Sequence, residues 1–145
     1  MNIQVIRATE IWQQAGAYYV RIQGMAKQHG ITLRREFDDK DTPETKYIVL
    51  TNDEFPVATC RFYETGPGRS VLGRVVVLPE YRCRGLGRMV VEEAERWLRE
   101  LGFREVAIDS RIEAVPFYRK LGYAPVDDAV FKSGAFDCIR MRKQI

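Results

Sequence analysis

The sequence predicts an α/β (α+β mixed) fold, a mixed but mostly antiparallel sheet of about six or seven strands with about four helices on its two faces. Three observations carry this prediction. Short strand patterns separated by turns fill the middle of the chain, an apolar run at Val75–Leu78 leads into an amphipathic helix, and a further strand pattern follows that helix. Turns join antiparallel strands, whereas a strand, helix, strand succession joins parallel ones. The 145 residues suit a single domain, 1–145.

The first elements are a strand and a long helix. Residues 3–7 form a short β pattern, and Thr9 is a suitable N-cap for a helix that reaches about His29. Gly30 then supplies the stop signal. Residues 34–44 are polar and without periodicity, which predicts a loop.

Three strands are expected next. Residues 46–51 and 57–63 are rich in β-formers and flank a turn, so they predict a hairpin. Gly66–Gly68 makes the following turn. The strand at 71–78 contains Val75–Leu78, which is apolar on both faces and therefore indicates a central, buried strand.

The C-terminal half alternates helices and strands. Apolar residues recur at helical spacing over 86–101, and 105–109 reads as the next strand. A shorter helix is expected over 113–121, followed by two last strands at 123–126 and 136–141.

Composition limits the function classes. The formal net charge of +3 is too small to predict nucleic-acid binding, and no apolar run is long enough for a membrane span or a signal peptide. We therefore expect no nucleic acid, no membrane and a cytoplasmic location. Cys60, Cys83 and Cys138 lack metal or redox spacing, so reduced thiols and no metal are expected.

The most informative stretch joins the buried strand to the long helix through a glycine turn. At a helix N-terminus the first backbone N–H groups have no internal partner, so an anion such as a pyrophosphate can accept their hydrogen bonds. Gly85 and Gly87 let the backbone approach such a ligand, and Arg82, Arg84 and Arg88 add charged donors.

Two motifs resemble those of the GNAT acetyltransferases. Arg82-x-x-Gly85-x-Gly87 is similar to the family's Gln/Arg-x-x-Gly-x-Gly/Ala signature, and Ala114-x-x-x-Tyr118-x-Lys120-x-Gly122-Tyr123 is similar to its second element. The resemblance implies an enzyme that moves an acetyl group directly from acetyl-coenzyme A to an amine. It also implies a sheet that splays at the centre.

The resemblance further implies a coenzyme site, and the sequence offers candidate catalytic residues. The family's coenzyme-binding positions correspond here to a strand edge and a loop: Val75, Val76, Val77, Arg82, Cys83, Arg84, Gly85, Leu86, Gly87 and Arg88. We predict that Tyr118 donates its phenolic proton to the departing sulfur, because the expected helix would place it toward the cleft; the alternative is a core aromatic. The amine must also lose a proton, and Glu36, Asp38 and His29 are candidates because carboxylate and imidazole are the usual bases.

Glu36-Phe37-Asp38 with Asp41 in the N-terminal half, and Met141-Arg142-Lys143 near the end of the chain, resemble a subgroup of small uncharacterised bacterial GNAT proteins. The chain departs from them at Lys46, where the subgroup often has His, and Arg111 replaces an asparagine common in the family. The acceptor is therefore left as a small-molecule or peptide amine, and a homodimer is left open.

The stretch of sequence around the glycine turn suggests four other interpretations. A dinucleotide-binding module would need a third glycine where Val90 stands, and a P-loop would need Gly-Lys-Ser/Thr after the turn. A non-catalytic acyl-coenzyme A sensor or a basic nucleic-acid adaptor with the same fold stays open, because fold does not fix function.

Overall fold

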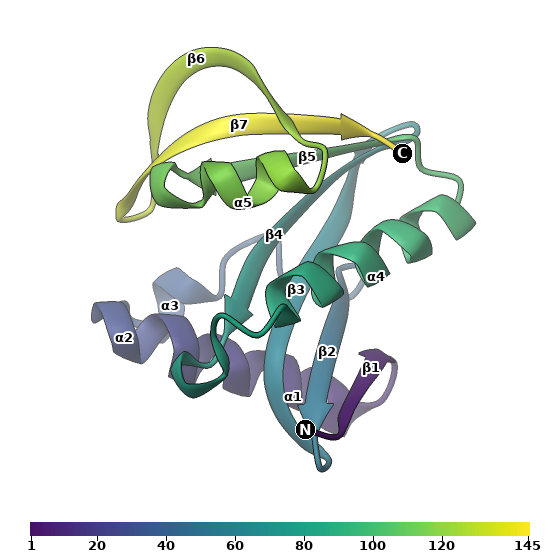
Figure 1. Ribbon diagram of the computed structural model, residues 1–145, viewed down its shortest axis with the longest axis vertical. Coiled ribbons are helices and arrows are strands. Elements are labelled where there is room, and N and C mark those ends of the chain that lie inside the picture. The colour runs from purple at the N-terminus through teal and green to yellow at the C-terminus, as the bar shows by residue number, and fades with distance from the viewer.

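The computed structural model describes all residues 1–145 and contains one seven-stranded sheet (Figure 1). The strands lie in the order β1-β2-β3-β4-β5-β7-β6, and only the β4–β5 pair is parallel. This confirms the predicted class. The strands are β1 (Ile3–Arg7), β2 (Lys46–Asn52), β3 (Phe55–Gly66), β4 (Arg69–Val77), β5 (Glu105–Arg111), β6 (Ala124–Ser133) and β7 (Phe136–Gln144).

Helices cover both faces of the sheet. They are α1 (Ile11–Arg21), the π-helical segment Ile22–Ala26, α2 (Lys27–His29), α3 (Leu33–Glu36), α4 (Leu86–Glu100) and α5 (Val115–Lys120), with single 3-10 turns at Pro79–Tyr81 and Ile112–Ala114. Figure 1 shows α1 to α3 behind the sheet and α4 and α5 in front of it. None of these helices has the length and apolarity that a membrane span requires.

Strand β3 shows why both faces are covered. The Cys60 thiol lies 3.5 Å from the Val90 carbonyl oxygen of α4, and the rings of Phe62 and Trp97 meet edge to face at 5.4 Å. Arg61, between them in sequence, is also buried but pairs with Asp38 on the opposite face. Because successive side chains alternate across a strand, a strand buried on both sides needs a layer on each face.

The sheet splits between β4 and β5. Parallel pairing is limited to Arg69, Ser70 and Val71 of β4, opposite Glu105 to Ala107 of β5. Beyond Val71, β4 continues to pair with β3, whereas β5 pairs with β7, and the two strands diverge in Figure 1. The second half of β4 therefore has one unpaired edge, which faces the gap.

A β-bulge lies in this unpaired half of β4. The register with β3 changes from Arg61 opposite Gly73 to Thr59 opposite Val76, so β4 has one extra residue. Arg74 lies in the bulge and has a φ of 50°. This is a left-handed conformation, which costs energy for any residue with a Cβ. The bulge redirects the side chains of β4 at the point where the sheet opens.

The long N-terminal helix confirms the expected end but not the expected start. Glu10, not Thr9, is the N-cap, because its side chain and that of Gln13 form a reciprocal capping box. The helix runs to His29, and Gly30 follows with φ of 65°. Its π-helical segment contains Gly24, where a Cβ would lie 2.7 Å from Cγ1 of Val76. Glycine thus lets this segment approach β4 closely.

Two other boundaries differ from the prediction. Residues 33–36 form α3, which overlaps the start of the loop expected at 34–44. No side chain caps this helix, and the buried ion pair of Glu36 with Arg21 holds it in place. Strand β6 extends to Ser133, beyond the expected 123–126, because it pairs with β7 across a bulge between Pro125 and Val130. Its side chains are mostly exposed, so no hydrophobic pattern marks it.

Candidate active site

The turn between β4 and α4 presents a row of free backbone donors. The N–H groups of the six residues 83–88 donate no hydrogen bond to another backbone group, and the first such bond in α4 is from Met89 to the carbonyl oxygen of Gly85. Cys83 and Gly85 both have positive φ, 61° and 81°. Alternating left- and right-handed residues turn successive N–H groups toward one concavity, which suits an anion.

The three arginines of this turn play different parts. Arg82 donates from Nε to the Val77 carbonyl oxygen and from Nη2 to the Gly24 carbonyl oxygen, both at 3.2 Å, so it ties the end of β4 to the N-terminal helix. The Arg84 guanidinium lies 5.6 Å from the ring centre of Tyr81. Arg88 is exposed and pairs with Glu92 at 3.2 Å. All three arginines are exposed, but only Arg82 donates hydrogen bonds to backbone carbonyl groups.

A groove of about 660 Å³ runs from this turn along the open edge of β4. We call it the loop groove. Gly87 lies in its wall, where an added Cβ would stand 3.3 Å from the ring of Phe117 on α5. The groove is lined by β4, the turn, the N-terminal helix and α5, and includes Gly24, Val75, Val76, Val77, Arg82, Cys83, Gly85, Leu86, Gly87, Arg88, Phe117 and Tyr118.

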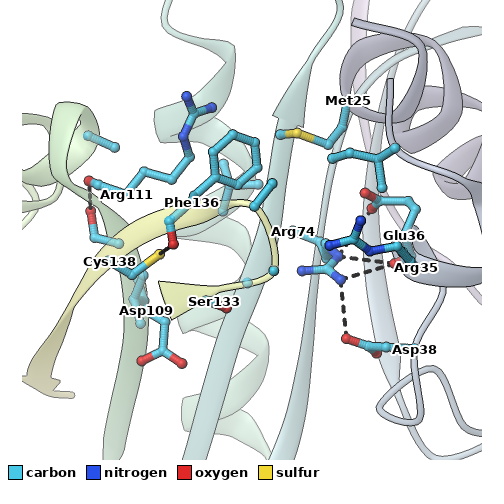
Figure 2. A pocket seen from close by; sticks show the side chains of 18 of the residues that line it. Met25, Arg35, Glu36, Asp38, Arg74, Asp109, Arg111, Ser133, Phe136 and Cys138 are labelled. Carbon is cyan, nitrogen blue, oxygen red and sulfur yellow. Dashed lines mark hydrogen bonds and ion pairs between the residues drawn. The ribbon is translucent and has the colours of Figure 1, made fainter. Parts of the chain in front are cut away.

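A second hollow of about 400 Å³, the inner cavity, lies next to the loop groove and is shown in Figure 2. Its apolar lining includes Ile31 and Phe136, and its charged lining comes from α3, β4 and β5. The two hollows share five lining residues: Met25, Val75, Arg111, Ala114 and Tyr118. A molecule in the loop groove and one in the inner cavity would therefore meet beside Val75 and Tyr118.

One wall of the inner cavity is a buried ion cluster. Arg74 reaches from the bulge to the Glu36 carboxylate at 3.1 Å, and its guanidinium also donates to the Glu36 carbonyl oxygen at 3.0 Å. Arg21, which is fully buried, pairs with the same carboxylate at 3.0 Å and with Asp41 at 2.7 Å. The cluster thus fixes the strained Arg74 against α3 and the long helix.

Residues 8–123 match the family model for the acetyltransferase (GNAT) family. An uncharacterised acetyltransferase of Streptococcus pyogenes is 32% identical over 110 residues, 76% of this chain and 77% of that protein. The chain belongs to the GNAT acetyltransferase family.

Further relatives agree with this assignment. The uncharacterised N-acetyltransferase YjcF of Bacillus subtilis is 28% identical over 90% of this chain and 92% of its own. A crystal structure of a proposed N-acetyltransferase from Lactobacillus plantarum superposes with a TM-score of 0.91, at 28% identity over 99% of both chains. PaiA N-acetyltransferase of Thermoplasma acidophilum, solved with coenzyme A, has a TM-score of 0.74 at 16% identity over both whole chains. The chain is therefore an N-acetyltransferase with the GNAT fold.

Tyr118 of this GNAT domain stands at the junction of the two hollows. It is 7% exposed, and its ring packs edge to face on Phe117 at 4.9 Å and on Tyr123 at 5.9 Å. Burial raises the pKa of its phenol, and no hydrogen bond contributes to that shift. The hydroxyl is therefore protonated and free to donate.

Glu36 and Asp38 both line the inner cavity, but arginines occupy both carboxylates. The Glu36 side chain is 3% exposed and bridges Arg21 and Arg74. Burial alone would raise the pKa of Asp38, but hydrogen bonds and charge from Arg61, with charge from Arg74, outweigh it and lower the pKa. A carboxylate with a lowered pKa is a poor proton acceptor, which disfavours Asp38 as the base. Glu36 is disfavoured by geometry, because two arginines hold its buried carboxylate.

His29 lies on the loop groove and not on the inner cavity. It is exposed, and its ring meets Phe136 edge to face at 5.1 Å. The Arg111 guanidinium lies 4.0 Å from the centre of the Phe136 ring. The turn between β6 and β7 thereby reaches the end of the long helix and bounds the inner cavity.

Several lining residues were missed by sequence reasoning. Arg35, Arg74, Asp109 and Phe136 all line the inner cavity, yet none belongs to a recognisable motif. A weak signal existed for Arg74, since a charged residue directly before an apolar strand run needs a partner if it is buried. The others come together only through tertiary structure.

Proposed function

We propose that this chain transfers the acetyl group of acetyl-coenzyme A directly to a primary amine of a small molecule or a peptide. The observation that carries the proposal is the continuous path from the six free N–H groups of residues 83–88, along the open edge of β4, to Tyr118. The inner cavity joins this path at Tyr118 and offers a separate place for the amine. The coenzyme A bound to the structurally similar PaiA protein supports the same use of the fold here.

The loop groove has the donors that the coenzyme requires. The free N–H groups of residues 83–88 would hold the pyrophosphate, with Arg84 and Arg88 adding charge. The edge of β4 at Val75–Val77 that faces away from β3 has no strand partner and would hydrogen-bond the pantetheine arm in the manner of an added strand. When bound there, acetyl-coenzyme A supplies the acetyl group as a thioester.

Tyr118 is the residue that we assign to proton donation. Its protonated hydroxyl lies where the two hollows meet, so it can give a proton to the sulfur as the thiol departs. A backbone N–H on the free edge of β4 near Val77 would face the thioester oxygen and stabilise the charge that develops on it.

Glu36 and Asp38 take a positioning role in this proposal. Their ion pairs with Arg74 hold the bulge, and through it the edge of β4, in place. Neither carboxylate needs to accept a proton if the amine reacts in its neutral form. We therefore expect activity to rise with pH until the amine is deprotonated. The pH profile should not reflect the titration of a carboxylate.

A thiol-release assay tests the proposed function. Purified protein is mixed with acetyl-coenzyme A and a panel of amines: amino acids, peptides, polyamines, amino sugars and aminoglycosides. The expected result is steady thiol release with at least one class, together with a rise in melting temperature with acetyl-coenzyme A but not with NADH. Stabilisation without amine-dependent thiol release would instead indicate a non-catalytic acyl-coenzyme A sensor.

A further inference from the structure

The charges around the inner cavity do not balance. Six arginines and five acids line the cavity or are linked to its lining by ion pairs, Asp41 indirectly through Arg21 and Arg61. Each acid has an arginine within ion-pair distance: Asp41 with Arg21 at 2.7 Å, Glu36 with Arg74 at 3.1 Å, Asp38 with Arg61 at 2.8 Å, Glu113 with Arg111 at 2.9 Å, and Asp109 with Arg140. Arg35 is the only one of these six arginines without an acid at ion-pair distance.

Arg35 has unused donors at the edge of a defined cavity. It lies on α3 next to Glu36, is exposed, lines the inner cavity and forms no ion pair or side-chain hydrogen bond. Figure 2 shows it on the same side of the cavity as Glu36, Asp38 and Arg74, with Arg111 and Phe136 on the other side. A guanidinium presents donors in a planar fork that matches a carboxylate.

The acids of the cavity are poorly suited to bind a cation. The Asp38 and Asp109 side chains are 33% and 29% exposed, but arginines already hold both carboxylates. A cationic acceptor would have to compete with those arginines and would also meet the charge of Arg35. An anionic group, in contrast, gains an unpaired partner.

From this imbalance we propose that the acceptor is an amine that also carries a carboxylate, of the size of an amino acid or short peptide, and that Arg35 binds the carboxylate. The inference rests on the proposed acetyl transfer and names its substrate class. The cavity of about 400 Å³ is suited to such a molecule, and Ile31 and Phe136 offer an apolar wall to its side chain.

Arg35 acts on the binding and orientation of the acceptor and not on the protonation of its amine, because the acceptor's own carboxylate neutralises the charge of Arg35. The carboxylate of the acceptor supplies binding, while its amine extends toward Val75 and Tyr118 at the junction with the loop groove.

The test compares three acceptors that differ in charge: leucine, leucinamide and cadaverine. Rates of thiol release at saturating acetyl-coenzyme A are referred to the deprotonated amine, because the amide group itself lowers the amine pKa. The wild-type protein should prefer leucine. Arg35→Gln should lower kcat/KM for leucine about tenfold to a hundredfold, the range for a lost hydrogen bond to a charged group, and leave kcat/KM for leucinamide unchanged.

Two variants serve as controls. Arg34→Gln removes the neighbouring arginine, which is exposed but does not line the cavity. It should leave kcat/KM unchanged for both leucine and leucinamide. Arg35→Lys keeps the charge without the planar fork and should retain part of the preference for leucine. Equal use of leucine and leucinamide, a preference for cadaverine, or equal losses for both substrates in Arg35→Gln would overturn the proposal.

A binding experiment separates this inference from the proposed function. Leucine and leucinamide are titrated calorimetrically into protein saturated with coenzyme A. If leucine binds the wild type and not Arg35→Gln, while no amine ever releases thiol, the carboxylate site stands and the transfer reaction fails. If thiol is released but leucine has no advantage in binding or turnover, the reaction stands and the carboxylate site fails.

Discussion

Arg82 donates a hydrogen bond to the carbonyl oxygen of Val77, five residues earlier in the chain, at 3.2 Å. The first residue of the loop motif therefore holds the end of β4 and, through Gly24, the N-terminal helix. Arg82 thus supports the shape of the coenzyme loop, whereas Arg84 and Arg88 make no hydrogen bond to a backbone carbonyl group.

Arg82→Ala should lower both stability and coenzyme affinity. The loss of two hydrogen bonds to carbonyl groups should cost about 1–3 kcal/mol in the free energy of unfolding, measured by urea denaturation. Arg88→Ala is the matched control, because its exposed pair with Glu92 contributes little to stability. A fully stable Arg82→Ala protein with weakened coenzyme binding would show that Arg82 contacts phosphate and not the protein.

Gly87→Val should weaken coenzyme binding without unfolding the protein. An added Cβ would lie 3.3 Å from the Phe117 ring and 3.9 Å from Cγ2 of Val77, so a branched side chain would fill the loop groove. If two or so N–H contacts to phosphate are lost, the Kd should rise roughly tenfold to a thousandfold by calorimetry. Gly73→Ala, on β4 but with open space around the new Cβ, should bind normally. Unchanged affinity in a folded Gly87→Val protein would place the coenzyme elsewhere.

The coenzyme half of the site could be predicted from sequence because its parts are close together along the chain. The buried strand, the glycine turn and the amphipathic helix follow one another from Val75 to Glu100, so local spacing reveals their arrangement. The acceptor half could not be predicted in this way. Arg74 meets Glu36 from 38 residues away, and Arg21 meets it from 15. Local sequence patterns do not predict contacts between residues so far apart in the chain.

Asp41→Asn should destabilise the protein strongly. The Asp41 carboxylate is 8% exposed and accepts hydrogen bonds from Arg21 at 2.7 Å and from the Tyr47 hydroxyl at 2.8 Å. Removing its charge leaves Arg21 buried with one acid fewer, which should cost about 3–5 kcal/mol in the free energy of unfolding. Asp39→Asn, an exposed neighbour, should stay within about 0.5 kcal/mol of wild type.

The cost of Asp41→Asn should also depend on pH. Burial alone would raise the pKa of Asp41, but the hydrogen bonds and charge of Arg21 outweigh it and hold the pKa far below its usual value. A lowered folded-state pKa contributes stability above the unfolded value of about 4 and loses it as the pH falls further. The difference between wild type and variant in urea titrations should therefore shrink below about pH 4. A pH-independent difference would mean that packing, not charge, sets the cost.

Tyr118→Phe should separate catalysis from packing, since it removes only the oxygen. The hydroxyl makes no hydrogen bond to the protein, so the variant should keep its melting temperature and its affinity for acetyl-coenzyme A. Turnover with the best acceptor should fall by roughly 10²-fold, the low end for general acid catalysis, because a thiolate leaves tolerably well without a proton. Tyr123→Phe is the matched control: its hydroxyl donates to Glu95 at 2.7 Å, so this variant should lose stability instead. Wild-type turnover in a folded Tyr118→Phe protein would leave Tyr118 as a packing residue and withdraw the catalytic assignment.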